Sequence, residues 1–161
     1  MPILEAGFVD RRGISNPADY LRRAGPTITV QVGPGVPILP DEQMPIADPT
    51  VNPSFAPRMG NYLALLDTGA SDSCIDQVLA DQLALPLVDR WRAGGIGGAH
   101  EMNVYLAALT IPSLNITKNG LFMAVRLTES GQPHSVLIGR DLLTDLIIIY
   151  DGRRGSVSVC R

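Results

Sequence analysis

The stretch Leu63-Ala64-Leu65-Leu66-Asp67-Thr68-Gly69-Ala70-Ser71 decides how this chain folds. Its apolar first half is typical of a strand buried in a core, and an acidic residue follows at once. Burying a carboxylate costs several kcal/mol unless a partner stabilises its charge. We therefore single out Asp67 as a candidate functional residue. The alternative is a turn aspartate that accepts hydrogen bonds from the amides of Ser71 or Cys74.

The sequence before this stretch divides into three parts. Residues 1–26 are expected to form an N-terminal arm, with a short helix that begins near Asn16 and ends at Gly25-Pro26. Residues 27–32 alternate β-branched and polar side chains, as a half-buried strand does. Residues 33–57 are rich in proline, which fixes φ and removes a backbone donor. We expect an extended surface excursion there.

The sequence after Asp67 indicates short strands separated by turns. A helix is expected over residues 75–83, capped by Asp72 or Ser73. A glycine cluster predicts the tip of a β-hairpin, formed by Gly94, Gly95, Ile96, Gly97 and Gly98. Further strands are expected over 102–106, 108–111, 121–127, 135–138, 147–150 and 156–159, with a helical turn or two at 142–146. Residues 27–161 are thus predicted to be one all-β domain, closed or sandwich-like, with one or two short helices.

Composition narrows the class of protein. The chain has 161 residues, a net charge of −3 and 45% hydrophobic residues, which fits one ordered domain and gives no basic patch for nucleic acid. The two cysteines, Cys74 and Cys160, are too few for a disulfide framework and are interpreted as reduced. His100 and His134 are interpreted as surface or packing residues. No signal peptide or membrane segment is visible, so we expect a cytoplasmic protein without a membrane partner.

Three elements of the chain together resemble the retropepsin-like aspartic proteases. They are residues 65–71, the glycine-rich stretch at 94–98, and Val136-Leu137-Ile138-Gly139-Arg140-Asp141-Leu142-Leu143, in the order found in that family. The resemblance covers roughly residues 60–159. It implies a closed acid-protease barrel in which the glycine-rich hairpin is a flap, and Gly139, Arg140 and Asp141 are structural residues near the site.

The resemblance also implies a mechanism. Two aspartates share one proton, because like charges at hydrogen-bond distance do not both ionise easily. One activates a water molecule as a base, and the other donates a proton to the developing oxyanion. This chain holds a single Asp-Thr-Gly, so the second Asp67 must come from another copy in a homodimer. No metal or cofactor is required.

The resemblance assigns roles to the residues that flank Asp67. Thr68 would hydrogen-bond across the dimer axis, and Gly69 would let substrate approach the backbone closely. Ala70 lacks a hydroxyl that could favour the charged carboxylate, so we expect activity at mildly acidic to neutral pH. Residues 94–98 would close over an extended peptide that adds as a strand.

One departure from the family and one rival function stay open at this point. Ser71 stands where retroviral members commonly have an acidic residue paired to the arginine of Gly-Arg-Asp, so Arg140 is expected to meet Asp72 or Asp141 instead. The rival function is a dimerising or peptide-binding module of the same fold whose catalysis is feeble.

Overall fold

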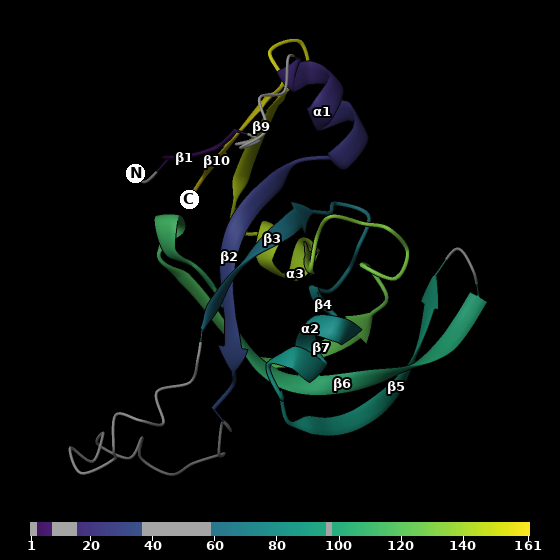
Figure 1. The fold of residues 1–161 in the computed structure, drawn as a ribbon. Coiled ribbons are helices and arrows are strands. Elements are labelled where there is room, and N and C mark those ends of the chain that lie inside the picture. The colour runs from purple at the N-terminus through teal and green to yellow at the C-terminus, as the bar shows by residue number, and fades with distance from the viewer. Residues whose placement is uncertain (1–2, 8–15, 37–58, 96–97) are drawn as a thin grey trace, which may run out of the picture.

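The computed structural model describes residues 3–7, 16–36, 59–95 and 98–161, with 3–7 described as backbone only. Most of the expected proline-rich excursion, 37–58, lies outside the described residues, and so do Ile96 and Gly97 of the hairpin tip. Figure 1 shows the strands curling round into a barrel, with the helix Pro17–Ala24 and the C-terminus near one end of it.

The described elements follow one another in a mainly β order. They are β1 (Ile3–Gly7), α1 (Pro17–Ala24), β2 (Thr27–Pro34), β3 (Gly60–Leu66), β4 (Cys74–Asp76), α2 (Gln77–Gln82), β5 (Leu87–Gly95), β6 (Gly98–Ile111), the 3₁₀ turn η2 (Pro112–Leu114), β7 (Ile116–Val125), β8 (Val136–Ile138), α3 (Arg140–Leu143), β9 (Ile147–Asp151) and β10 (Ser156–Cys160).

Six strands close into the barrel, in the order β2-β3-β8-β4-β7-β6. The ring closes because β2 also pairs with β6, from Gln31↔Thr110 to Pro34↔Ala107. β5 lies outside the ring and pairs with β6 alone. The barrel encloses a core of fully buried side chains that includes Val30, Val32, Ala64, Ile75, Leu109, Phe122, Val136 and Ile138. The expected closed all-β barrel is confirmed, with three short α-helices in the described residues where one or two were expected.

A parallel pair of strands positions Asp67. β3 and β8 run side by side, with Leu66 opposite Ile138. Both strands therefore end at the same edge of the barrel, where Asp67 follows β3 and Gly139 follows β8. This brings together the two sequence elements that lie farthest apart among the predicted site residues.

The N-terminal arm contributes to a second sheet of order β1-β10-β9. β1 pairs with β10 from Ile3↔Cys160 to Gly7↔Ser156. α1 packs against the turn between β9 and β10, because a Cβ on Gly155 would lie 2.2 Å from the carbonyl carbon of Pro17. The strand β1 is an element that the sequence pattern did not predict.

The helix expected over 75–83 begins later than predicted. Residues Cys74–Asp76 form β4, which pairs with both β7 and β8, and the helix starts at Gln77. Ile75 is fully buried, so the sheet takes the residues that would have formed the first turn. The side chain of Ser73 bonds to Asp141 instead of capping the helix.

The helix α1 is confirmed, and Asn16 caps it by accepting hydrogen bonds from the amides of Ala18 and Asp19. The predicted hairpin is also confirmed in its arms, because β5 pairs with β6 as far as Gly95↔Gly98. Among the helices of the described residues, none has the length and apolar character needed to cross a membrane.

Candidate active site

Asp67 stands half-buried at the end of β3. Its amide donates to the carbonyl of Ile138 at 2.9 Å, and its carboxylate Oδ1 accepts from the amide of Gly69 at 2.9 Å. The carboxylate therefore caps its own loop at Gly69, and not at Ser71 or Cys74 as the turn interpretation proposed. A Cβ on Gly69 would lie 3.1 Å from Oδ1, so a side chain at this position would crowd the carboxylate.

Arg140 ties the loop after Asp67 to α3. Its Nη1 donates to the carbonyls of Thr68 and Gly69 at 2.7 and 3.1 Å, and its Nη2 donates to Ser71 Oγ at 2.8 Å. The backbone amide of Arg140 also donates to the carbonyl of Ala70 at 3.0 Å. The guanidinium thus holds Thr68, Gly69 and Ser71, and the Arg140 amide holds Ala70, in the loop next to Asp67.

The prediction that Arg140 meets Asp72 or Asp141 is wrong. It meets neither Asp72 nor Asp141 through its side chain, and its partners are the hydroxyl of Ser71 and main-chain carbonyls. The planar guanidinium offers five donors, and here two of its nitrogens donate to three neutral oxygens. The loss of the acidic residue at position 71 therefore leaves the connection intact.

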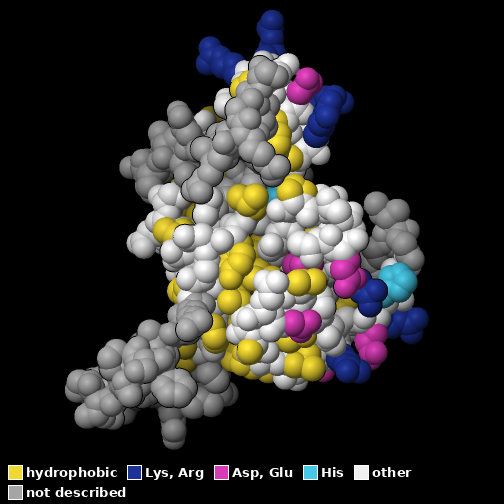
Figure 2. Space-filling view, viewed as in Figure 1, with side chains coloured by type: hydrophobic (Ala, Val, Ile, Leu, Met, Phe, Trp, Pro, Cys, Tyr) yellow, Lys and Arg dark blue, Asp and Glu magenta, His cyan; other side chains and the backbone are white. Residues whose placement is uncertain are grey.

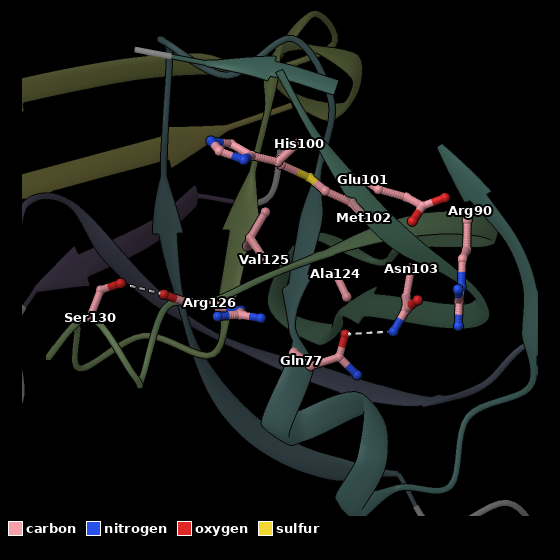
Figure 3. A pocket seen from close by; sticks show the side chains of 10 residues that line it. All are labelled: Gln77, Arg90, His100, Glu101, Met102, Asn103, Ala124, Val125, Arg126 and Ser130. Atoms are coloured by element: carbon pink, nitrogen blue, oxygen red, sulfur yellow. Dashed lines mark hydrogen bonds between the residues drawn. The ribbon is translucent and has the colours of Figure 1, made fainter. Parts of the chain in front are cut away.

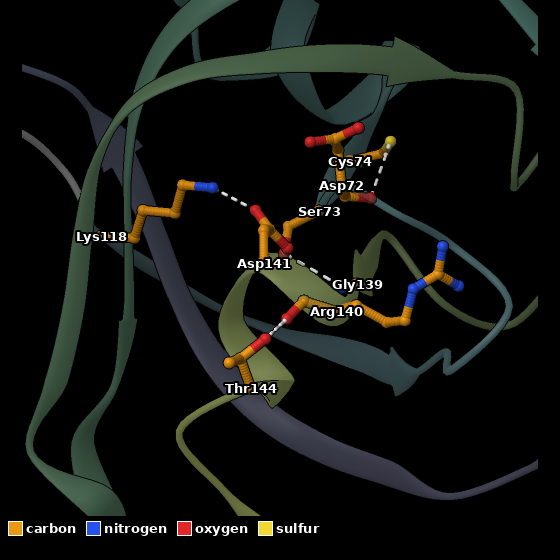
Figure 4. A network of polar contacts seen from close by, with 8 residues as sticks. All are labelled: Asp72, Ser73, Cys74, Lys118, Gly139, Arg140, Asp141 and Thr144. Atoms are coloured by element: carbon orange, nitrogen blue, oxygen red, sulfur yellow. Dashed lines mark hydrogen bonds and ion pairs between the residues drawn. The ribbon is translucent and has the colours of Figure 1, made fainter.

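A second connection joins the site loop to β7 (Figure 4). Ser73 Oγ donates to Asp141 Oδ1 at 2.7 Å and accepts from the amide of Gly139 at 3.1 Å. Lys118 forms an ion pair with the same carboxylate and lies 5.3 Å from the ring centroid of Phe122. Sequence reasoning missed Lys118 and took Ser73 for a helix cap, because nothing in the local pattern of either residue identifies its distant partner.

The charge of Asp141 is stabilised by these contacts. Burial raises the pKa of its carboxyl, but the hydrogen bonds from Lys118 and Ser73 outweigh burial and hold that pKa below its usual range. The predicted structural role of Asp141 agrees with this position.

Gly139 allows the two segments to touch. A Cβ at this position would lie 2.5 Å from the carbonyl carbon of Asp72 and 2.9 Å from the amide of Ser73. Since real Cβ atoms do not approach backbone so closely, only glycine fits here without a shift of the loop.

Cys74 lies beside this network and is buried. Burial, together with the nearby carboxylates of Asp72, Asp141 and Asp67, raises the pKa of its thiol to about 11. A thiol with such a pKa is a weak nucleophile at neutral pH, so Cys74 acts as a small apolar residue. Cys160 is likewise free and buried.

The hairpin of β5 and β6 carries the described glycines of the predicted flap. Gly94 has nothing within 4 Å of where a Cβ would stand, and Gly98 has a φ of +102°, which favours glycine. Trp91 pairs with Met102 lower on the hairpin. The structure therefore confirms a hairpin at this position. In the described residues no group of three or more His, Cys, Asp or Glu side chains is placed to hold a metal ion.

Comparison with known proteins gave matches among solved structures alone. No family model and no curated protein matches the chain. The EIAV protease in complex with the inhibitor HBY-793 is 23% identical, with a TM-score of 0.37, over 53% of this chain and 76% of that one. The retroviral protease-like domain of Ddi1 from Leishmania major is 15% identical, with a TM-score of 0.38, over 63% and 84%. A retropepsin-like aspartic protease from Rickettsia conorii is 15% identical, with a TM-score of 0.37, over 63% and 73%.

The chain is similar to these retroviral, retroviral protease-like and retropepsin-like structures. The identities are low, so these matches are similarities of fold. The geometry of the Asp67 loop determines what the chain can do chemically.

Proposed function

We propose that this chain is an aspartic endopeptidase that acts as a homodimer, with one Asp67 from each subunit. The observation that carries the proposal is the fixed position of Asp67. Its backbone is held by Ile138 of the neighbouring strand, and the loop after it is held by the guanidinium of Arg140. A loop fixed on both sides suits a carboxylate that must hold a water molecule and a substrate carbonyl in register.

The proposed reaction follows from two such carboxylates facing each other. They share one proton, so the ionised one removes a proton from water while the water oxygen attacks the scissile carbonyl carbon. The protonated one donates its proton to the carbonyl oxygen as negative charge develops there. Collapse of the tetrahedral intermediate then breaks the C–N bond: the leaving nitrogen takes the proton that the first carboxylate removed from water, and the hydroxyl proton returns to the second carboxylate as the C=O bond re-forms. The Gly69 amide, 2.9 Å from Oδ1, orients the carboxylate for this exchange.

The exposed face of β9 supports the dimer. β9 is an edge strand of the β1-β10-β9 sheet and leaves Ile147, Ile149 and Tyr150 exposed at 60%, 58% and 53%. An exposed apolar edge strand favours pairing with another chain. β9 also follows α3 closely in the chain, and α3 carries the Arg140 that holds the Asp67 loop. A second copy that paired along β9 would therefore meet this chain at the strand that follows α3 in sequence.

The proposal extends to substrate and location. An extended peptide would lie between the β5–β6 hairpin and the Asp67 loop and add to the sheet as a strand. We place the activity in the cytoplasm, because Cys74 and Cys160 are free thiols, as is usual in a reducing compartment.

Cleavage of a mixed peptide library tests the proposal. Wild type should cut peptides at mildly acidic to neutral pH, and a transition-state mimic such as pepstatin should inhibit it. Asp67→Asn should lower the rate by about a thousandfold or more, because the amide cannot exchange the shared proton. Size and circular dichroism of the variant should match wild type. A folded dimeric wild type that cuts nothing would instead favour the peptide-binding module.

A further inference from the structure

A fork opens between the hairpin and the barrel. β6 pairs with β7 only as far as Val104↔Met123, and beyond that point it continues with β5 alone. β7 instead runs on beside β4 to Asp76↔Val125. The two parts of the sheet therefore diverge. A cavity of about 840 Å³ occupies the fork (Figure 3), lined by Gln77, Arg90, His100, Glu101, Met102, Asn103, Ala124, Val125, Arg126 and Ser130.

The residues that line this cavity do not include Asp67. One wall belongs to the hairpin, with residues of β5 and β6. The other belongs to the barrel, with Gln77 of α2, the end of β7, and Arg126 and Ser130 after it. Any ligand that touched both walls would connect the hairpin to the barrel.

A polar network makes the floor of the fork rigid. Asn103 Nδ2 donates to Gln77 Oε1 at 3.1 Å, and Gln77 Nε2 donates to the hydroxyl of Tyr105 at 2.6 Å. That hydroxyl donates in turn to Asp81 Oδ1 at 3.3 Å, and Tyr105 is 5% exposed. Because these groups hold one another, the cavity is preformed and needs little ordering to accept a ligand.

The charges in the fork favour an anionic ligand. Arg90 comes from β5 and Arg126 follows β7, and Figure 3 shows them on opposite sides of the Gln77–Asn103 pair. Among the described residues that line the cavity, Glu101 is the one acidic residue. Figure 2 shows Lys, Arg, Asp and Glu side chains gathered over this part of the molecule, whereas hydrophobic ones lie toward its centre.

Both arginines are accessible to a ligand. Arg90 and Arg126 are exposed. Arg126 Nε lies 3.6 Å from Glu129, but the two side chains are 80% and 54% exposed, and such a surface pair contributes little. A planar guanidinium binds a carboxylate through two parallel hydrogen bonds, so each arginine can take one carboxylate.

We propose that the fork is a binding site for a small ligand with two or more carboxylates, one held by Arg90 and one by Arg126. Such a ligand bridges the hairpin and the barrel and restricts the hairpin's movement. Binding itself does not depend on catalysis. The consequence for peptide cleavage, a slower opening of the hairpin, rests on the proposed function.

Citrate is the probe that tests this site, titrated into the full-length Asp67→Asn protein at constant ionic strength. Calorimetry should show saturable binding of citrate and none of acetate. The emission of Trp91, the single tryptophan of the chain, should change with the same midpoint, because Trp91 pairs with the lining residue Met102. The Asp67→Asn background separates this test from the test of protease activity.

Variants that each replace one arginine by glutamine identify the residues that bind citrate. Arg90→Gln and Arg126→Gln should each raise the Kd for citrate by about tenfold or more, since each removes a charge-assisted pair. Arg153→Gln, in the exposed turn between β9 and β10, removes the same charge elsewhere and should leave the Kd unchanged. Absence of saturable binding, or equal loss in all three variants, would overturn the proposed site.

Discussion

At the scale of single residues, the site depends on close approach as much as on charge. Gly139 lets the Gly-Arg-Asp segment touch the backbone of Asp72 and Ser73, and this contact brings Arg140 to the Asp67 loop. The arginine then needs no acidic partner, because the oxygens it binds are already in position.

The close approach at Gly139 predicts a large effect of one methyl group. Gly139→Ala should lower the free energy of unfolding by about 1–3 kcal/mol, because its Cβ would overlap the carbonyl of Asp72. Gly94→Ala is the matched control, with nothing within 4 Å of the new Cβ, and should change stability by less than about 0.5 kcal/mol. Denaturant unfolding measures both. Equal effects would contradict the close contact.

His134 is a buried residue whose proton balance links stability to pH. It is 1% exposed, its Nε2 lies 2.6 Å from Thr27 Oγ1, and its Nδ1 has no hydrogen-bond partner among the described residues. Burial lowers its pKa from the ordinary value of 6.5. The interpretation of His134 as a packing residue agrees with this position.

The lowered pKa of His134 determines how the stability of the fold changes with pH. Below pH 6.5 the imidazole of His134 is protonated in the unfolded chain but stays neutral in the folded one. The free energy of unfolding therefore falls as pH drops from 6.5 through the folded pKa. Above pH 6.5 the contribution of neutral, buried His134 to stability is fully present. His134→Gln should therefore lose less stability than wild type between about pH 7 and about pH 5, measured by thermal unfolding. Parallel pH curves for the two proteins would rule out this linkage.

At the scale of elements, local pattern predicted strands where side chains alternate or where apolar runs end at turns. The strand at 27–32, the hairpin arms around residues 94–98 and the closing strands at 147–150 and 156–159 are all present. Local pattern failed where pairing with strands far away in the sequence determines the secondary structure. Ile75 and Asp76 were predicted to begin a helix, yet they belong to β4 in the sheet between β7 and β8.

β9 is the element on which the proposed dimer depends. Ile149→Lys should shift the protein to monomer and lower cleavage in parallel, because it places a charge in a contact that each copy makes. Leu121→Lys, 44% exposed on β7, adds the same charge to another strand and should leave the dimer intact. Light scattering coupled to size exclusion reports the mass. A dimer that survives Ile149→Lys would remove β9 from the interface.

At the scale of the whole molecule, the sequence predicted a closed barrel and the residues of its candidate site but not the contacts that hold them. Asp67, Gly139 and Arg140 were identified from motifs and do lie together. The role of Lys118 and the pairing of β1 with β10 depend on residues far apart in the chain. Such contacts follow from how distant segments pair in the barrel and in the β1-β10-β9 sheet, which no local pattern encodes.

The central claim is that one active site needs two Asp67 carboxylates. Wild type and Asp67→Asn chains, refolded together in equal amounts and checked for mixed dimers by a mass tag, test it directly. If both carboxylates are required, only pure wild-type dimers cut peptide, and activity per total chain is about a quarter of that of wild type. Activity of about a half would mean that each subunit works alone, and would contradict the shared site.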